Sequence, residues 1–341
     1  MKKLAIFSVI LLIYGGLMAQ SQMQRMTDAR NVFSTASVKI MGGSDDVGNG
    51  ITAGTPTSGT RAMPFIGESN WPKQTNGAWH NKLIAHPNGT LSAIWPVGPT
   101  SEERGTGYNF FNGTSWTGTS SDRIESQRAG WGCVCALNGG GEMVISHNGT
   151  TGLTINKRAV AGQGAWQEST LTGPVVSNGT ATSTGLYWPV VASVGDTIHL
   201  FAITESDPGY LYQGISTCLV YYRSIDNGAT WDINAELVGG LDAAYMPRFT
   251  ADAYELAAKP GCVALVYGTQ FTDVFMLKST DGGLNFTKTM IFDNPIPNDI
   301  DMSTPAGIFD TTFVSNETYA IAIDDQNNVH LAFGIIRVIR T

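Results

Sequence analysis

Two nearly identical octapeptides contain the carboxylates whose spacing first suggests chemistry. The chain reads SIDNGATW at 224–231 and STDGGLNF at 279–286, and in both an Asp precedes a Gly by two residues. A pair of carboxylates can serve as general acid and general base. The same pattern also favours a tight turn, because a short carboxylate accepts backbone N–H bonds and the glycine adopts a positive φ. We interpret Asp226 and Asp281 as turn-forming residues rather than catalytic groups.

The elements that must position these turns repeat along the chain. Five segments place a polar, glycine- or asparagine-containing turn between two apolar runs, which predicts a β-hairpin in each: LIAHPNGTLSAIW from Leu83, CVCALNGGGEMVIS from Cys133, PVVASVGDTIHLFAI from Pro189, ELAAKPGCVALVY from Glu255 and AIAIDDQNNVHLAFG from Ala320. Their equivalent positions, Leu91, Met143, Ile198, Val263 and Val329, are 52, 55, 65 and 66 residues apart. This period is typical of a propeller blade with four strands.

A second half completes each of the first four units. Another apolar run follows the hairpin, then a glycine-rich turn, then an aromatic residue at Trp116, Trp166, Trp231 or Phe286. The two octapeptides are therefore the turns between the third and fourth strands of successive blades. We predict an all-β chain that forms a β-propeller of four-stranded blades, five or six in number.

The octapeptides also resemble a known motif. SIDNGATW matches the Asp box of the sialidase-like (BNR-repeat) propellers, and STDGGLNF matches it except at its last two residues. The resemblance implies that the box is structural and lies opposite the functional face of the propeller. The residues that carry the match are Ser224, Asp226, Gly228 and Trp231 in the first box, and Ser279, Asp281, Gly283 and Phe286 in the second.

Longer runs resemble a narrower group. TSGTRAMPFIGES, RGTGYNFFNGTSW, RIESQRAGWG and MLKSTDGG are similar to large secreted propellers of Bacteroidetes-type bacteria, many of which carry a C-terminal sorting domain for type IX secretion. Such a domain would follow the propeller, and the given sequence stops after the second strand of the fifth repeat. We expect either that 35–66 supplies closing strands, with SVKIM at 37–41 and RAMPFI at 61–66 as candidates, or that a sixth blade is missing. We slightly favour the second alternative.

The loops that precede the inner strands are the place to look for a functional face. They carry arginine and aromatic side chains, which suit the recognition of carboxylates and sugar faces. Five residues at or just before inner strands should converge on the central funnel, and we expect them to bind an extracellular ligand, most plausibly a glycan: Arg128, Trp131, Trp188, Asp252 and Tyr254.

An enzymatic alternative is a sialidase-type glycosidase, a class that uses a Tyr nucleophile. The resemblance would imply a Tyr–Glu pair, an Asp acid and three arginines, the first in an Arg-Ile-Pro-like motif. The chain offers RAMP at 61–64, with one residue too many before Pro64, and no pattern assigns catalytic residues. We therefore expect a non-catalytic binding protein, with the sialidase and a structural surface protein as alternatives.

Composition limits location and partners. Residues 1–19 begin with two lysines, continue through an apolar run and end in small residues, which predicts a secretory signal peptide. Its removal would take the formal net charge from −8 to −10. This acidity argues against nucleic acid and anionic membranes as partners. We expect an exported monomer without a cofactor, in which a loop-rich segment at 20–60 precedes the propeller at 61–341.

Three minor features have competing interpretations. The cysteines Cys133, Cys135, Cys218 and Cys262 match no metal-binding spacing; one of the first two could pair with one of the others, or all could be buried thiols. The Asn-Gly-Thr sequences at 88, 112, 148 and 178 predict turns rather than glycosylation sites. The acidic run 293–301 could bind Ca²⁺, but a solvated loop is the better interpretation, and we expect no metal.

Overall fold

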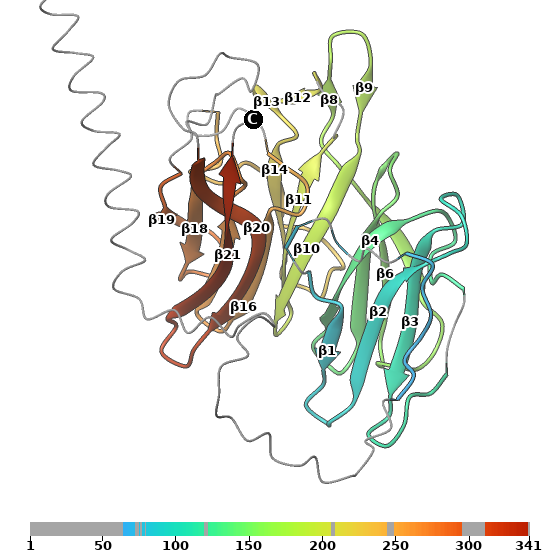
Figure 1. The fold of residues 1–341 in the computed structure, drawn as a ribbon. Coiled ribbons are helices and arrows are strands. Elements are labelled where there is room, and N and C mark those ends of the chain that lie inside the picture. Colours follow the sequence, from blue (N-terminus) through green and yellow to red (C-terminus); the bar gives the residue numbers. More distant parts are fainter. Residues whose placement is uncertain are drawn as a thin grey trace, which may run out of the picture. The chain divides into compact units, whose positions relative to one another are not determined.

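Antiparallel four-stranded meanders make up most of the fold (Figure 1). The computed structural model describes residues 64–71, 75, 77–78, 80–118, 122–205, 209–243, 249–294 and 311–339, all of which except Pro64 belong to the unit Phe65–Thr341. All regular secondary structure in these ranges is β-strand, so the prediction of an all-β fold is confirmed. None of the described residues belongs to a helix long and apolar enough to cross a bilayer.

Three complete blades follow one another. Each is a meander in which every strand pairs with the next, and the strand order is the order in the sequence. The blades are β4 (Gly130–Ala136), β5 (Glu142–His147), β6 (Gly152–Arg158) and β7 (Gln167–Thr172); β10 (Leu186–Val194), β11 (Thr197–Thr204), β14 (Leu219–Ser224) and β15 (Ile233–Glu236); and β16 (Tyr254–Lys259), β17 (Cys262–Tyr267), β18 (Val274–Ser279) and β19 (Thr287–Phe292).

Two further sheets flank these blades. The first contains β1 (Leu83–Ala85), β2 (Leu91–Val97) and β3 (Gly105–Phe111), and a bridge from Phe111 to Trp116 begins a fourth strand. The last is the hairpin of β20 (Thr311–Ile323) and β21 (Val329–Ile339). All five predicted hairpins are therefore present. The proposed closing strand at 37–41 and the start of the one at 61–66 lie outside the described residues, and 64–66 contain no strand.

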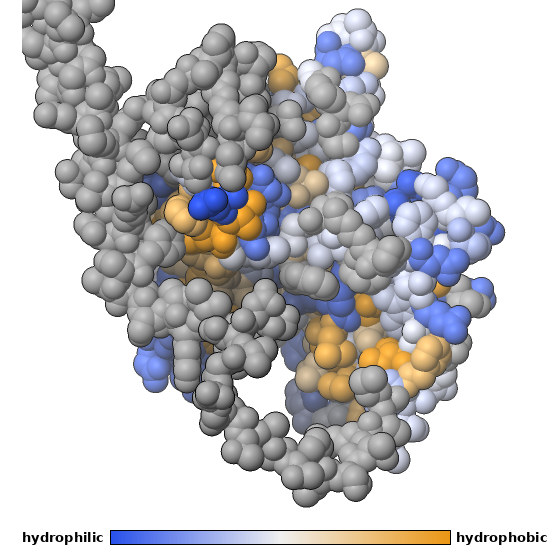
Figure 2. Space-filling model, in the orientation of Figure 1, coloured by the Kyte–Doolittle hydropathy of each residue, from blue (hydrophilic) through white to orange (hydrophobic). Residues whose placement is uncertain are grey.

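The edge of the last sheet is apolar. Within the described part of the chain, β21 pairs only with β20. Ile336 on β21 and Phe313 on β20 are 36% and 49% exposed. Figure 2 shows apolar side chains gathered over this hairpin, and a second group over the first sheet.

The core lies between the inner strands. β10 packs against β4 on one side and β16 on the other, and β16 packs against β20. Burial is complete in second strands and is lost in an outer one: every residue of β5 and β17 is buried, whereas β7 is almost wholly exposed. This difference is what a blade packed face to face with its neighbours requires, since its outer strand meets solvent.

A small inserted sheet was not predicted. It joins β8 (Val176–Ser177), β9 (Thr182–Ser183), β12 (Leu211–Tyr212) and β13 (Ile215–Ser216) in the order β13-β12-β8-β9. The first two strands come from the connection between β7 and β10, and the last two come from the loop between β11 and β14. In Figure 1 this sheet extends beyond the end at which β10 begins. We call that end the upper face, and the opposite end the lower face.

The Asp-box carboxylates hold turns. Asp226 Oδ1 accepts the N–H groups of Ala229 and Thr230 at 3.0 and 2.8 Å, and its Oδ2 accepts the Thr230 hydroxyl at 2.6 Å. Ser224 Oγ donates to Asp226 and accepts the Gly228 N–H, both at 2.8 Å. The turns occupy the same position in neighbouring blades.

The second box makes the same bonds with different residues. Asp281 Oδ1 accepts the N–H groups of Leu284 and Asn285, and the Asn285 amide replaces the threonine hydroxyl at 2.8 Å from Asp281 Oδ2. Arg223 joins the two turns by donating to the Gly282 carbonyl at 2.8 Å. The aromatic residues pack edge-on: Trp231 lies against Tyr222 of its own blade, and Phe286 lies against Tyr221 of the preceding blade.

The Asn-Gly-Thr sequences form turns, as predicted. In all four, the Asn side-chain oxygen accepts the N–H of the Thr two residues later, and the Gly has a positive φ of 79° to 97°.

All four cysteines are unpaired and buried, so the buried-thiol alternative holds. Burial raises the pKa of Cys133 to about 11 and that of Cys218 to about 12, which keeps both protonated and unreactive at neutral pH.

Candidate functional site

The upper face is marked by residues in an unusual backbone conformation. Trp131 and Trp188 both have φ 48°, Asp252 has φ 56° and Glu317 has φ 67°. The first two and Glu317 lie where the pairing of an inner strand with its neighbour shifts register, and Asp252 lies two residues before β16. Positive φ is rare for bulky side chains, and such strained residues cluster at functional sites.

An imidazole joins the two tryptophans. His147, at the end of β5, stacks on Trp131 with ring centroids 5.4 Å apart and meets the edge of Trp188 at 5.5 Å. Its Nδ1 accepts the Trp188 N–H at 3.2 Å, so the neutral ring carries its proton on Nε2. Burial and the nearby Arg104 and Arg128 lower the pKa of His147 to about 3. The imidazole is therefore neutral at physiological pH.

Arg104 also lies over the ring of Trp131. Its guanidinium carbon lies 4.1 Å from the centroid of Trp131 and 5.4 Å from that of Trp71. Its Nε donates to the Ala129 carbonyl at 3.1 Å. A Cβ on Gly130 would lie 2.7 Å from Arg104 Nη2, so glycine there lets the cation approach the strand. The resulting cation–π contacts are partly desolvated and hence stronger than exposed ones.

Arg128 adds a second cation. Its Nε donates to the Ser101 carbonyl at 2.9 Å, and its side chain is half-buried. Burial and the positive charge of Arg128 lower the pKa of Arg104 to about 10, although Glu102 acts in the opposite direction. Arg104 remains protonated at neutral pH. The terminal Nη nitrogens of both arginines make no hydrogen bond within the described ranges, so two forks of donors are available to an anion.

Two more donors belong to the tryptophans. The indole Nε1 atoms of Trp131 and Trp188 are buried and have no hydrogen-bond partner among the residues that the structure describes. Buried indole N–H groups usually find an acceptor. We call Trp71, Arg104, Arg128, Trp131, His147 and Trp188 the upper-face cluster.

Asp252 and Tyr254 lie beneath the surface. Both are fully buried. Asp252 Oδ1 is 3.5 Å from His80 Nε2, its Oδ2 accepts the Thr75 hydroxyl at 3.3 Å, and its carbonyl accepts the Ala78 N–H. Residues 75, 77, 78 and 80–82 thus fill the axis between the inner strands and cover the two side chains.

The five candidate residues therefore divide into two layers. Arg128, Trp131 and Trp188 meet at the upper face, whereas the Tyr254 hydroxyl donates to the Trp188 carbonyl from below. Trp71 and His147 were not predicted as site residues, and no local sequence pattern distinguishes them. The Arg61 of the RAMP motif lies outside the described residues.

The surface also contains a tyrosine next to a carboxylate. Tyr187 Oη donates to Glu205 Oε2 at 3.3 Å and to the Gly149 carbonyl at 3.1 Å, and the Ser183 hydroxyl donates to the same Glu205 oxygen at 2.7 Å. Tyr187 packs against Trp188, with ring centroids 5.5 Å apart. A carboxylate next to a phenol can act as its general base.

No metal site accompanies these groups in the described part of the chain, where no three or more His, Cys, Asp or Glu residues gather as ligands. The acidic run 293–301, considered above for Ca²⁺, lies mostly outside the described residues.

No protein-family model matches the chain, and no curated protein matches it. Among solved structures it is similar to a family 117 glycoside hydrolase of the marine bacterium Zobellia galactanivorans (11% identity, 81% of this chain and 88% of that one, TM-score 0.42). It is also similar to the NanB sialidase of Streptococcus pneumoniae (13% identity, 67% and 32%, TM-score 0.40). A third is an α-L-arabinofuranosidase of Clostridium thermocellum (8% identity, 63% and 72%, TM-score 0.38). Similarity at this level concerns the path of the chain only.

Proposed function

We propose that this chain is an exported, non-catalytic propeller that binds an extracellular glycan at its upper face, and that the glycan carries a carboxylate or sulfate group. The observation that carries the proposal is the position of Arg104, stacked 4.1 Å over Trp131 and close to Arg128. The secretory signal at 1–19 supports export.

The chemistry of the cluster fits an acidic sugar. Half-buried indoles offer flat surfaces for the C–H face of a sugar ring. The planar guanidinium groups of Arg104 and Arg128 can donate paired hydrogen bonds to a carboxylate or sulfate. Because the chain as a whole carries a net charge of −8, this cationic surface is a local feature. Short-range contacts, rather than long-range attraction, must therefore provide the affinity.

A binding experiment tests the proposal. The purified protein is applied to a glycan array that carries neutral, carboxylated and sulfated sugars, and affinities for trigalacturonic acid and neutral galactotriose are measured by calorimetry. We expect acidic sugars to bind, and Arg128→Ala and Trp188→Ala to weaken binding by at least about tenfold, the loss of one charge-assisted bond or stacking contact.

Arg337→Ala is the matched control, because Arg337 is exposed on β21 and its side chain makes no hydrogen bond or ion pair with the described residues. It should bind as the unchanged protein does. Equal binding of neutral and acidic sugars, or unchanged binding by both site variants, would contradict the proposal.

The alternative is a glycosidase, and the Tyr187–Glu205 hydrogen bond is the observation that favours it. A sialidase-like reaction would use the phenol as nucleophile and the carboxylate as its base. A fluorogenic sialoside and a panel of aryl glycosides decide between the two. Turnover that Tyr187→Phe abolishes would establish the enzyme, whereas glycan binding without turnover supports the binding protein. Absence of both would leave the structural surface protein.

A further inference from the structure

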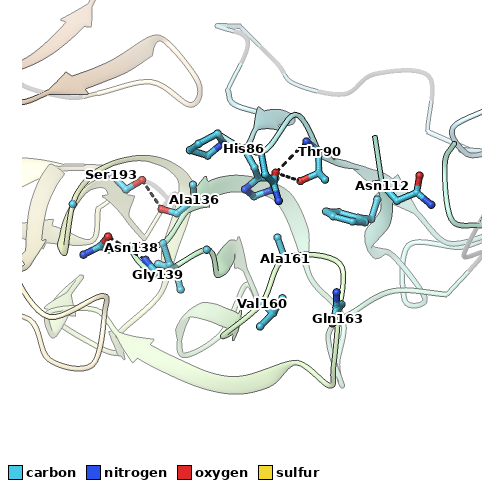
Figure 3. Close-up of a pocket in the computed structure, with 16 residues that line it drawn as sticks. His86, Thr90, Asn112, Ala136, Asn138, Gly139, Val160, Ala161, Gln163 and Ser193 are labelled. Atoms are coloured by element: carbon cyan, nitrogen blue, oxygen red, sulfur yellow. Dashed lines mark hydrogen bonds between the residues drawn. The ribbon is translucent and has the colours of Figure 1, made fainter. Parts of the chain in front are cut away.

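A cavity opens on the lower face, at the other end of the strands that carry the two tryptophans. Trp131 and Ala136 lie near opposite ends of β4, about 16 Å apart along an extended strand. Ala136 lines a cleft of about 620 Å³, within the size range of small-molecule sites. Turns of the sheet β1–β3, of the blade β4–β7 and of the blade that begins with β10 surround the cleft, as Figure 3 shows.

The lining of the cleft carries no formal charge. The lining residues include no Asp, Glu, Lys or Arg. His86 is the one titratable lining group, and burial lowers its pKa, so that it is neutral at physiological pH; Glu142 acts in the opposite direction from 4.0 Å. The nearest charged side chains already have partners. Glu142 pairs with Arg158 at 2.6 Å, and Asp196 accepts the amide of Asn138 at 3.0 Å.

Side-chain amides provide donors at one end of the cleft. The Oδ1 atoms of Asn88 and Asn112 are committed to their own turns, where they accept the N–H groups of Thr90 and Thr114. This fixes the direction of each side chain and leaves its Nδ2 without a partner among the described residues. The exposed Gln163 amide makes no hydrogen bond to them either. Figure 3 shows Asn112 and Gln163 at the same end of the cleft.

The walls between these amides are apolar. Phe110 lines the cleft, and Val160, which is 49% exposed, faces it with Ala161 and Leu137. The ring of Phe110 reaches this position because residue 162 is glycine: a Cβ on Gly162 would overlap the ring. Apolar surface next to fixed neutral donors suits a ligand with both C–H faces and hydroxyl groups.

We propose that the lower-face cleft is a second binding site, and that it takes a neutral saccharide. An anionic ligand would find no cation in the lining, and a metal ion or cationic ligand would find no carboxylate. A neutral sugar matches both the amide donors and the apolar walls. This site is independent of the upper-face cluster, since the two lie at opposite ends of β4 and β10.

The test uses the purified chain and neutral oligosaccharides. A neutral-glycan array is followed by calorimetry with maltohexaose, cellohexaose and mannohexaose. We expect at least one to bind, and Val160→Asp to weaken binding by at least about tenfold because it places a charge on the apolar wall. Gln163→Ala should weaken it by a smaller factor through the loss of one donor.

Two control variants match these substitutions. Val175 is 68% exposed and lies outside the cleft, so Val175→Asp adds the same charge without effect on binding. Gln326→Ala removes an exposed amide from a distant turn. Trp188→Ala should weaken acidic-sugar binding and leave neutral-sugar binding unchanged, which separates the two sites. Binding of no neutral sugar, or binding unchanged by Val160→Asp in the folded variant, would overturn the proposal.

Discussion

Trp131 and Trp188 occupy the same position in neighbouring blades, and both have φ 48°. His147 lies between their rings, 5.4 Å from one and 5.5 Å from the other. The repeat of the fold thus places the same strained conformation side by side in two blades, and one buried imidazole connects them. The upper-face cluster is a product of blade-to-blade packing, which explains why its members come from distant parts of the sequence.

The contact between Gly130 and Arg104 gives a first prediction. Gly130→Ala should move the guanidinium away from Trp131, because the new Cβ would lie 2.7 Å from Nη2 and 2.9 Å from Nε. We expect a change in tryptophan fluorescence and weaker binding of trigalacturonic acid. Gly130 has no positive φ, so backbone strain should not contribute. Fluorescence and affinity equal to those of the unchanged protein would show that Arg104 tolerates the methyl group.

Adjacent glycines in the second Asp box give a matched pair. Gly282 and Gly283 have φ 73° and 83°, so alanine is strained at both. A Cβ on Gly282 meets nothing within 4 Å, whereas one on Gly283 would overlap the Tyr221 hydroxyl, which is 2.7 Å from His199 Nδ1. Gly283→Ala should therefore lower the melting temperature clearly more than Gly282→Ala. Equal losses in calorimetry would mean that strain alone matters.

A buried ion pair makes a third prediction. Glu142 is fully buried, and its Oε1 accepts hydrogen bonds from Arg158 Nε at 2.6 Å and from the Tyr108 hydroxyl at 2.8 Å. The guanidinium also stacks over Trp166, 4.1 Å from the ring centroid. Arg158→Met should cost about 3–5 kcal/mol in the free energy of unfolding, because it leaves a buried carboxylate without its cation.

The double variant separates charge from packing. Adding Glu142→Gln to Arg158→Met removes the unpaired charge, so urea unfolding should show part of the stability restored. A double variant that is less stable than Arg158→Met alone would indicate that the hydroxyl partners of Glu142, rather than its charge, dominate.

The fold was predictable from the sequence because its signals are local. The turns at PNG, NGGG, VGD, KPG and DDQNN each separate two apolar runs, and all five hairpins are confirmed. The inserted sheet escaped prediction because its strands, such as Val176–Ser177, are two residues long and carry no period. Short pairings of this kind are determined by tertiary context.

The site was less predictable because it depends on long-range packing. Arg104 reaches Trp131 from the neighbouring sheet only because residue 130 is glycine. Nothing near Arg104 in the sequence indicates this contact. Asp252 and Tyr254 were expected at the surface, but both are buried. Their position at the strand was sufficient to place them near the axis, but not to show that residues 75, 77, 78 and 80–82 fill the axis.

The first Asp box gives a fourth prediction, which ranks two variants. Asp226 is exposed, so water can satisfy the backbone N–H groups that its carboxylate releases, and Asp226→Ala should lower the melting temperature only modestly. Trp231→Ala should lower it more, although by less than a fully buried tryptophan would, because Trp231 is half-buried against Tyr222.

The effect of Asp226→Ala should also depend on pH. Hydrogen bonds from Thr230 and Ser224 lower the pKa of Asp226 from 3.8 to about 2. The ionised carboxylate therefore contributes its full stabilisation above pH 3.8 and loses it as the pH falls through about 2. Melting curves of the variant and the unchanged protein should converge towards acid pH, and a constant difference would contradict this role.

Two buried histidines predict that acid destabilises the fold at much milder pH. Burial, with a contribution from nearby arginines, lowers the pKa of His147 to about 3 and that of His199 to about 4, from 6.5 in the unfolded chain. Between these values the unfolded chain binds more protons than the native one, so stability is complete above pH 6.5 and falls as the pH decreases. Each histidine should contribute about 1.4 kcal/mol per pH unit in this window.

Urea unfolding at a series of pH values measures the slope of stability against pH. His199→Asn should make the slope shallower by the contribution of one proton. A slope that His199→Asn does not alter would mean that His199 is protonated in the native state.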